Sequence, residues 1–557
     1  MSLAYEKQIN SNRALCILLL FCLLCLIPFI NKAFHIDDPC YIWIAQQIQA
    51  HPFDFYGFSL NWSGEIIPVS KTTNPPLVSY YIALVAYWFG WSEIVLHTAF
   101  IVPACAVIMG TYLLAQELCN KPFIAALATA CTPVYLISST TIMCDVLMVS
   151  FWVFAVYFWR RGLRSNDYSL LAIASALISL SLLTKYSGLC LIPLLAVYSL
   201  FEKKKIGLWM LFFLMPIACF GLYEWTTYYL YGAGQITFAS SYSMARKKIL
   251  FVQIIANIVT GFSFLGGCLL IPFFYALVFW NKWKWAIGFL LISLILLLLL
   301  KYDVLNSYPI ANADGINWVF VVQLPFFVFA GASFIFIVVS DVLRNRDSDS
   351  LLLFLWVLGT FTFTIFVNWS VNGRSILPIA PVAGIIVIRY FSQSSMLFSN
   401  VKLRLYGPLA PTLLIALIVT SADYGLANSA RIAALAIHDS IKNVPGKVWF
   451  EGHWGFQYYM EKVGGTALDY ENPSLKKGDI VIIPSNNSNT KPLFNHLAAF
   501  RHEYTFDVSK LFSTMNLTTG SGFYSDVVGP LPYSVGYNPE KYFIFEMVAD
   551  KKTKFSY

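Results

Sequence analysis

Two adjacent carboxylates, Asp37 and Asp38, directly follow the first strongly apolar segment of the chain. Asp38 stands where the N-cap of a helix is expected, because Pro39 would fill the first helical position, where its missing N–H costs nothing. Apolar residues recur at helical spacing over 41–48, which predicts a short amphipathic helix along a membrane surface. Two interpretations stay open: the acids cap this helix and mark the lipid boundary, or they form part of a chemical site.

Further charged side chains are predicted to lie beside apolar spans on the same side as this pair. A charged group at membrane depth costs roughly 3 kcal/mol, so such groups usually mark a site or a water-filled cavity. The mixture of acids and bases suggests a base next to an anion-binding pocket. The set consists of Lys71, Asp145, Lys185, Arg246, Lys247, Lys248 and Arg374.

These residues also have purely structural interpretations. Asp145 begins a long apolar span, where a carboxylate interacts favourably with the helix dipole. Lys185 can extend its ammonium to the interface, and Arg374 can anchor the chain there. The basic run 246–248 can be a solvated loop, but its expected place on the outer side violates the positive-inside bias and favours an anionic ligand. His97, inside a span, is more typical of a hydrogen-bonded packing residue.

The composition excludes a soluble protein. Of the 557 residues, 58% are hydrophobic and 12% are charged, and the mean hydropathy is +0.65, far outside the globular range. A net charge of +8 is small for this length, so it indicates loop asymmetry and contacts with anionic lipids rather than nucleic-acid binding. The cysteines all precede residue 300 and show neither a disulfide framework nor zinc spacing.

The apolar segments predict an all-α polytopic membrane protein. A span needs about 20 apolar residues, and the chain has about thirteen such segments. Lys7 and Arg13 place the N-terminus in the cytoplasm, and an odd number of spans places the C-terminus outside. We expect a plasma membrane location, the inner membrane in a bacterium, with a first outer loop at about 31–76 and a helix over 78–89 at the outer surface.

The chain is expected to divide into a transmembrane module, 1–422, and a small extracytoplasmic α/β domain, 423–557. The second part shows no recognisable catalytic motif. Its pattern predicts helices over 427–443 and 455–462 and strands over 447–450 and 479–483.

Several short motifs, in this order along most of the first 400 residues, resemble those of the GT-C glycosyltransferases. The branch with the greatest similarity contains the protein O-mannosyltransferases and the lipid A aminoarabinose transferase. The motifs are Asp37-Asp38-Pro39-Cys40-Tyr41 with Ala45, Asn74-Pro75-Pro76-Leu77, Asp145 at the start of a span, Thr184-Lys185 with Gly188, and Arg374 with Leu377-Pro378.

The resemblance implies transfer of a sugar, a hexose or a pentose, from a polyprenyl-phosphate donor to a hydroxyl or phosphate acceptor at the outer face. It implies that the first acid of the loop motif, Asp37, is the key carboxylate. Cys40, Asn74 and His97 depart from the residues frequent in relatives, which leaves the donor sugar open. The acceptor also stays open: lipid A or another glycolipid, a cell-envelope glycan, or a protein.

The chemistry of such a transfer agrees with one essential carboxylate. A hydroxyl acceptor needs a general base, whereas a phosphate leaves as an anion and needs no protonating acid, unlike the leaving group of a glycoside hydrolase. Positive charge must stabilise that phosphate. Asp37, Asp38 and Asp145 could alternatively hold one divalent metal ion through oxygen ligands. The candidate phosphate-binding residues are Lys71, Lys185, Arg246, Lys247 and Arg374.

Two other functions are compatible with the sequence. A transporter or flippase of lipid-linked glycans would place ionisable residues near the midplane of broken spans, whereas here they gather at one face. A partner without catalytic activity would present its outer domain to another enzyme of envelope-glycan assembly.

Overall fold

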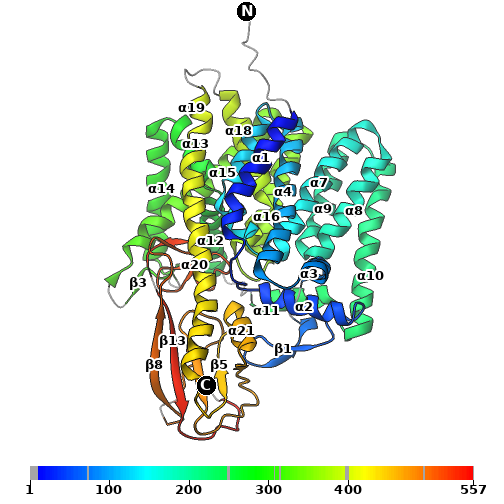
Figure 1. Cartoon of the computed structure of the whole chain (residues 1–557). Coiled ribbons are helices and arrows are strands. Elements are labelled where there is room, and N and C mark those ends of the chain that lie inside the picture. Colours follow the sequence, from blue (N-terminus) through cyan, green and yellow to red (C-terminus); the bar gives the residue numbers. More distant parts are fainter. Residues whose placement is uncertain are drawn as a thin grey trace, which may run out of the picture.

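The computed structural model is a bundle of helices that carries a small sheet region at one end (Figure 1). The prediction of an all-α polytopic membrane protein with a small C-terminal α/β part is confirmed. The described residues are 11–71, 74–246, 251–305, 308–312, 315–394, 401–493, 496–537 and 539–555.

Nine helices of the described residues are long and apolar enough to cross a membrane, or ten if the pair α5 and α6, bent by 62°, forms one span. The remaining predicted spans correspond to shorter helices. The bundle helices are α1 (Ser11–Leu26), α4 (Glu93–Leu118), α5 (Pro122–Ala130), α6 (Pro133–Ser139), α7 (Cys144–Ser165), α8 (Tyr168–Thr184), α9 (Leu191–Lys203), α10 (Leu214–Tyr231), α12 (Phe251–Leu269), α13 (Ile271–Phe279), α14 (Lys282–Lys301), α15 (Trp318–Asn345), α16 (Ser348–Thr362), α18 (Ile379–Ser394), α19 (Val401–Tyr406) and α20 (Leu409–Ile441).

The apolar stretch 254–280, which has the length of one span, forms two helices, α12 and α13. Leu270 adopts a left-handed φ of 54° between them, and Pro272 follows in the first turn of α13. A proline in a helix interior clashes with the preceding turn, so the chain restarts here. α12 packs backbone to backbone on α15, since a Cβ on Gly266 would lie 1.9 Å from the carbonyl oxygen of Phe327.

The loop after α1 forms a layer of short elements at one end of the bundle (Figure 1). The helix predicted after Asp37-Asp38 and the helix predicted over 78–89 are both present, as α2 and α3. The elements in this layer are α2 (Asp38–Ala50), β1 (Ser59–Asn61), β2 (Ile66–Pro68), η2 (Val69–Lys71), α3 (Leu77–Phe89) and α11 (Gln235–Arg246).

The C-terminal region contains a five-stranded sheet of order β6-β5-β7-β13-β8. β5 pairs in parallel with β6 and β7, and β13 pairs antiparallel with β7 and β8. The helix predicted over 427–443 is the last part of α20, which runs unbroken through the proposed boundary at 422; the two-domain division stays a prediction. The sheet consists of β5 (Val448–Phe450), β6 (Thr466–Ala467), β7 (Ile480–Pro484), β8 (Ala498–Phe506) and β13 (Glu540–Met547), with α21 (Trp454–Lys462) between β5 and β6.

Short two-stranded ladders complete the described elements. Two of them lie in the segment between β8 and β13, which returns to the end of the bundle. The ladders pair β9 (Phe512–Ser513) with β12 (Ser534–Val535), β10 (Met515–Asn516) with β11 (Ser521–Gly522), and β3 (Ala311–Asn312) with β4 (Gly315–Ile316).

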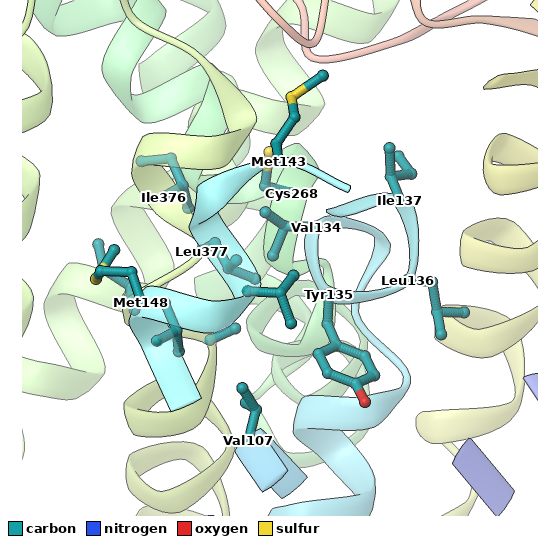
Figure 2. Packing of buried hydrophobic residues seen from close by; sticks show 14 of the residues in the cluster. Val107, Val134, Tyr135, Leu136, Ile137, Met143, Met148, Cys268, Ile376 and Leu377 are labelled. Atoms are coloured by element: carbon teal, nitrogen blue, oxygen red, sulfur yellow. The ribbon is translucent and has the colours of Figure 1, made fainter. Parts of the chain in front are cut away.

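The apolar core surrounds the break between α6 and α7. Figure 2 shows Val134, Tyr135, Met148, Ile376 and Leu377 packed around this turn, and all five side chains are buried. Close packing of this kind has few voids, so it transmits any displacement of its members. The start of α7 and the segment near residue 376 are therefore held in one fixed arrangement.

Candidate active site

Four charged side chains from separate segments meet at the end of the bundle near the C-terminal region. Arg374 Nη1 lies 2.8 Å from Asp37 Oδ2 and 3.9 Å from Asp145 Oδ2. Lys185 Nζ lies 2.6 Å from the other oxygen of Asp145, Oδ1. The structure thus brings together four of the residues that the sequence singled out. We call Asp37, Asp145, Lys185 and Arg374 the charge cluster.

The two acids of the charge cluster differ in access. The side chain of Asp37 is 33% exposed, whereas that of Asp145 is 2% exposed. Asp145 is held by Lys185, and its Oδ2 has no hydrogen-bond partner among the described residues. A buried carboxylate needs such charge compensation. Asp37 is the acid that an incoming molecule can reach.

Local chain geometry fixes the positions of the two cations, Lys185 and Arg374. Lys185 follows the last residue of α8 in an extended conformation, and the 3-10 helix η3 (Tyr186–Cys190) begins directly after it. A Cβ on Gly188 would lie 2.6 Å from backbone atoms of Ser181 and Leu182, so only glycine permits this tight return. Arg374 lies in the short helix α17 (Gly373–Ile376), which Asn372 caps by accepting from Ser375 N.

Asp38 fastens the loop that precedes α2 and does not cap that helix as predicted. The predicted N-cap role of Asp38 is wrong: Asp37 is the N-cap residue, and its side chain makes no cap hydrogen bond but binds Arg374. Asp38 is fully buried and accepts from His35 N at 2.9 Å and Ile142 N at 3.1 Å. Burial raises the pKa of Asp38 to about 7. Asp38 thereby ties the loop of Asp37 to the turn before α7.

A narrow pocket with room for about one water molecule lies against the cationic side of the charge cluster. Three of its hydrogen-bond donors have no partner among the described residues: Trp152 Nε1, Ser187 Oγ and Arg374 Nε. Such donors can bind a water molecule, an ion or a ligand. The pocket is lined by Trp152, Lys185, Ser187, Cys190, Thr360, Phe363, Arg374, Ser375 and Pro378.

The other predicted phosphate-binding residues lie elsewhere or outside the described residues. Lys71 is exposed at the end of η2 and has no ion pair within the part of the chain that the structure describes. Arg246 ends α11, and Lys247 and Lys248 lie outside the described residues. α11 adjoins η2, because Gln235 donates to the Ser70 carbonyl at 2.6 Å.

Asn74 and His97, two of the three residues that depart from the family motifs, have structural partners. The Nδ1 atom of His97 lies 2.8 Å from the carbonyl of Glu93, and the ring stacks on Phe34; this agrees with a packing role. Asn74 donates to the hydroxyl of Tyr41 at 3.2 Å, and that hydroxyl lies 3.1 Å from the thiol of Cys144. Asn74 therefore connects the first loop to the start of α7.

A second group of buried charges next to the site was not predicted from the sequence. Lys32 and Asp423 form an ion pair of 2.5 Å, and both side chains are 0% exposed. Asp423 also accepts from Thr514 and Tyr524 of the C-terminal region. An acid just beyond an apolar segment was the available signal, because intramembrane carboxylates are rare and usually paired.

A divalent ion held by Asp37 and Asp145 stays a prediction. The described residues contain no group of three or more His, Cys, Asp or Glu side chains that could hold a metal ion. The two carboxylates face the same guanidinium, and Lys185 takes up the remaining charge of Asp145.

The arrangement of helices is similar to that of known membrane enzymes. A structure of the Archaeoglobus fulgidus oligosaccharyltransferase matches with a TM-score of 0.50 and 15% identity, over 86% of this chain and 70% of the other. A family model described as dolichyl-phosphate-mannose-protein mannosyltransferase matches residues 73–225. The chain has the GT-C glycosyltransferase fold. This fold agrees with the resemblance that the motifs indicated.

Other solved GT-C structures match with similarly low identity. The archaeal oligosaccharyltransferase AglB from A. fulgidus, in complex with an inhibitory peptide and a dolichol-phosphate, matches with a TM-score of 0.50 and 12% identity over 86% of this chain and 70% of that one. ArnT from Cupriavidus metallidurans, bound to undecaprenyl phosphate, matches with a TM-score of 0.44 and 12% identity over 85% and 92%. No curated protein matches the sequence.

Proposed function

We propose that this protein is a membrane glycosyltransferase that moves a sugar from a polyprenyl-phosphate carrier to an acceptor at the outer face of the membrane. The observation that carries the proposal is the pocket where Lys185 and Arg374 lie beside donors that have no partner among the described residues, next to the accessible Asp37. A phosphate at the mouth of this pocket would supply acceptor oxygens and negative charge to both cations. The dolichol-phosphate in the complex of AglB, which has the same fold, is a carrier of this class.

The cationic side of the pocket is suited to the leaving phosphate. Lys185 and Arg374 supply positive charge, and Trp152 Nε1 and Ser187 Oγ supply neutral donors. Charge-assisted hydrogen bonds are roughly twice as strong as neutral ones, and they act most strongly where water is excluded. The pocket would therefore stabilise the charge that develops on the phosphate as the sugar departs.

Asp37 is the general base in this proposal, because the other two acids are already bound to other groups of the protein. Asp145 is buried against Lys185, and both carboxylate oxygens of Asp38 accept backbone N–H groups. The acceptor hydroxyl gives its proton to Asp37, and its oxygen forms a bond to the anomeric carbon. The bond from that carbon to the phosphate oxygen breaks, and its electron pair leaves with the phosphate.

Arg374 connects the two halves of this reaction. In the observed state its Nη1 binds Asp37, while its Nε has no partner among the described residues. A phosphate that binds Arg374 draws part of the guanidinium charge away from Asp37. The carboxylate is then free to accept a hydrogen bond from the acceptor hydroxyl when the donor is in place. Lys71, Arg246 and Lys247 stay predictions for phosphate binding, as do the sugar and the acceptor.

The proposal is tested by identifying the glycosylated products that the protein makes in cells. Strains without the gene, with the wild-type gene and with Asp37→Asn are compared by mass spectrometry of envelope glycolipids, glycans and glycoproteins. We expect a sugar-sized mass increment that only the wild type supports. Glu65→Gln is the matched control, because it is an exposed acid of the same loop. Wild-type amounts of the product with Asp37→Asn would refute the role of Asp37.

A further inference from the structure

The C-terminal region contributes a buried tyrosine to the wall of the charge cluster. The ring of Tyr524 lies beneath Arg374, with the guanidinium carbon 5.8 Å from the ring centroid. It also contacts His35, two residues before Asp37, edge to face at 5.4 Å. Tyr524 is buried although it lies 150 residues beyond Arg374 in the sequence. A cation over an aromatic face is attracted by the negative charge density of the ring.

The hydroxyl of Tyr524 is anchored to the bundle through Asp423 of α20. Tyr524 donates to Asp423 Oδ2 at 2.8 Å, and Thr514 donates to Oδ1 at 2.8 Å. Lys32, at the end of the first membrane helix, completes this group through its 2.5 Å ion pair with Asp423. Burial lowers the pKa of the neighbouring His35 to about 4, so this imidazole is neutral at physiological pH and the charge balance is that of Lys32 and Asp423 alone.

The backbone next to Tyr524 is fastened to the backbone next to Arg374. Gly373 N donates to the Phe523 carbonyl at 2.7 Å, and Asp526 N donates to the Val371 carbonyl at 2.9 Å. A Cβ on Gly373 would lie 2.5 Å from the Phe523 ring, so the two segments are in direct contact. The position of Arg374 is thus tied to the C-terminal region on both its backbone and its side chain.

We propose that Tyr524 is a positioning residue for Arg374. Held by Asp423, its ring keeps the guanidinium between Asp37 and the phosphate pocket, and it does not itself touch the substrate. The C-terminal region then serves as a wall of the site that sets the affinity for the lipid phosphate. This inference rests on the proposed function, because it assigns Arg374 to the donor phosphate.

The test is equilibrium binding of radiolabelled undecaprenyl phosphate and dolichyl phosphate to the purified full-length protein in nanodiscs. We expect Tyr524→Leu, which removes ring and hydroxyl, to weaken binding about 10-fold, and Tyr524→Phe, which keeps the ring, only about 3-fold. In an Arg374→Ala background the same changes should alter affinity by less than about 2-fold, because Tyr524 acts through Arg374.

Tyr533 supplies the matched control. It is a buried tyrosine of the same C-terminal region, but its hydroxyl donates to the Gly267 carbonyl, away from the charge cluster. Tyr533→Phe and Tyr533→Leu should leave the affinity unchanged. The thermal midpoint of each variant reports folding, and if Tyr524→Leu does not fold, the cycle with Tyr524→Phe decides.

The outcomes separate this inference from the proposed function. If the wild type binds neither lipid phosphate, the proposed function fails, and the inference fails with it. If the wild type binds and Arg374→Ala weakens binding, but Tyr524→Leu and Tyr524→Phe bind like the wild type, the positioning role alone is wrong. Equal losses from the Tyr524 changes with and without Arg374 would indicate a general structural role and would also overturn it.

Discussion

Arg374 lies between two carboxylates but binds them unequally, with its Nη1 atom 2.8 Å from Asp37 and 3.9 Å from Asp145. Asp145 has Lys185 as a nearer partner at 2.6 Å, so Arg374 serves mainly Asp37. The exposed acid is therefore paired with the cation that also lines the pocket. This pairing links Asp37 to the anion that Arg374 would bind.

Replacing Trp152 by Phe should weaken lipid-phosphate binding without lowering stability. The indole N–H is buried and has no partner among the described residues, while the ring packs against Trp356 with centroids 5.9 Å apart. Leaving such a donor unsatisfied costs about 1–3 kcal/mol, and its removal offsets the packing that the smaller ring loses. We expect a 3- to 10-fold loss of affinity for undecaprenyl phosphate (a range of about 0.6–1.4 kcal/mol) with an unchanged or raised thermal midpoint. A lowered midpoint with unchanged affinity would contradict this assignment.

Replacing Gly188 by Ala should disturb both Lys185 and the pocket. The new methyl group would lie 2.6 Å from the backbone of Ser181 and Leu182, so η3 must move. Overpacking of this kind costs about 1–3 kcal/mol. We expect a lower thermal midpoint and weaker binding of undecaprenyl phosphate. Gly221→Ala is the control, because nothing lies within 4 Å of its Cβ position, and the prediction fails if the two variants behave alike.

Glu540 should make stability fall as the pH rises from about 4.5 to 7. Burial raises the pKa of Glu540 to about 7, although Asn486 donates to its Oε1 at 2.8 Å. The unfolded chain ionises first, so the folded form holds an extra proton in this window and loses relative stability with rising pH. Thermal midpoints between pH 4 and 8 should fall by about 2–5 °C through this group. The fall of the thermal midpoint with pH should be smaller in Glu540→Gln and unchanged in Glu503→Gln, whose carboxylate lies at the protein surface. An unchanged fall in Glu540→Gln would exclude Glu540 as its source.

Arg160, at the other end of α7 from Asp145, should be essential for stability but not for binding. Its guanidinium makes two parallel bonds of 2.8 Å to Asp349 and also binds Glu117. Removing one partner of a buried pair leaves an uncompensated charge and costs about 3–5 kcal/mol. Arg160→Ala should therefore lower the thermal midpoint strongly, whereas Arg161→Ala, with a half-exposed side chain, should change it little. Equal midpoints for the two variants would be evidence against the buried network.

The sequence features that predicted the site were charged groups beside apolar segments. Asp37, Asp145, Lys185 and Arg374 were identifiable because each adjoins a run of apolar residues, where charge is costly. The sequence did not predict that Asp37 rather than Asp38 is the N-cap residue, or that its side chain binds Arg374 instead of capping α2. The orphaned N–H of Trp152 also has no sequence signal, since a tryptophan in an apolar helix is ordinary.

By itself the sequence determined the fold class and the charged residues at the ends of the spans, because apolar runs and turn residues act over short stretches of chain. Only the tertiary structure decided which of these charges meet. Lys32 and Asp423 pair across 391 residues, and Tyr524 reaches Arg374 from the C-terminal region. Such contacts depend on how separate helices pack against one another. The local sequence around one residue therefore does not identify its distant partner.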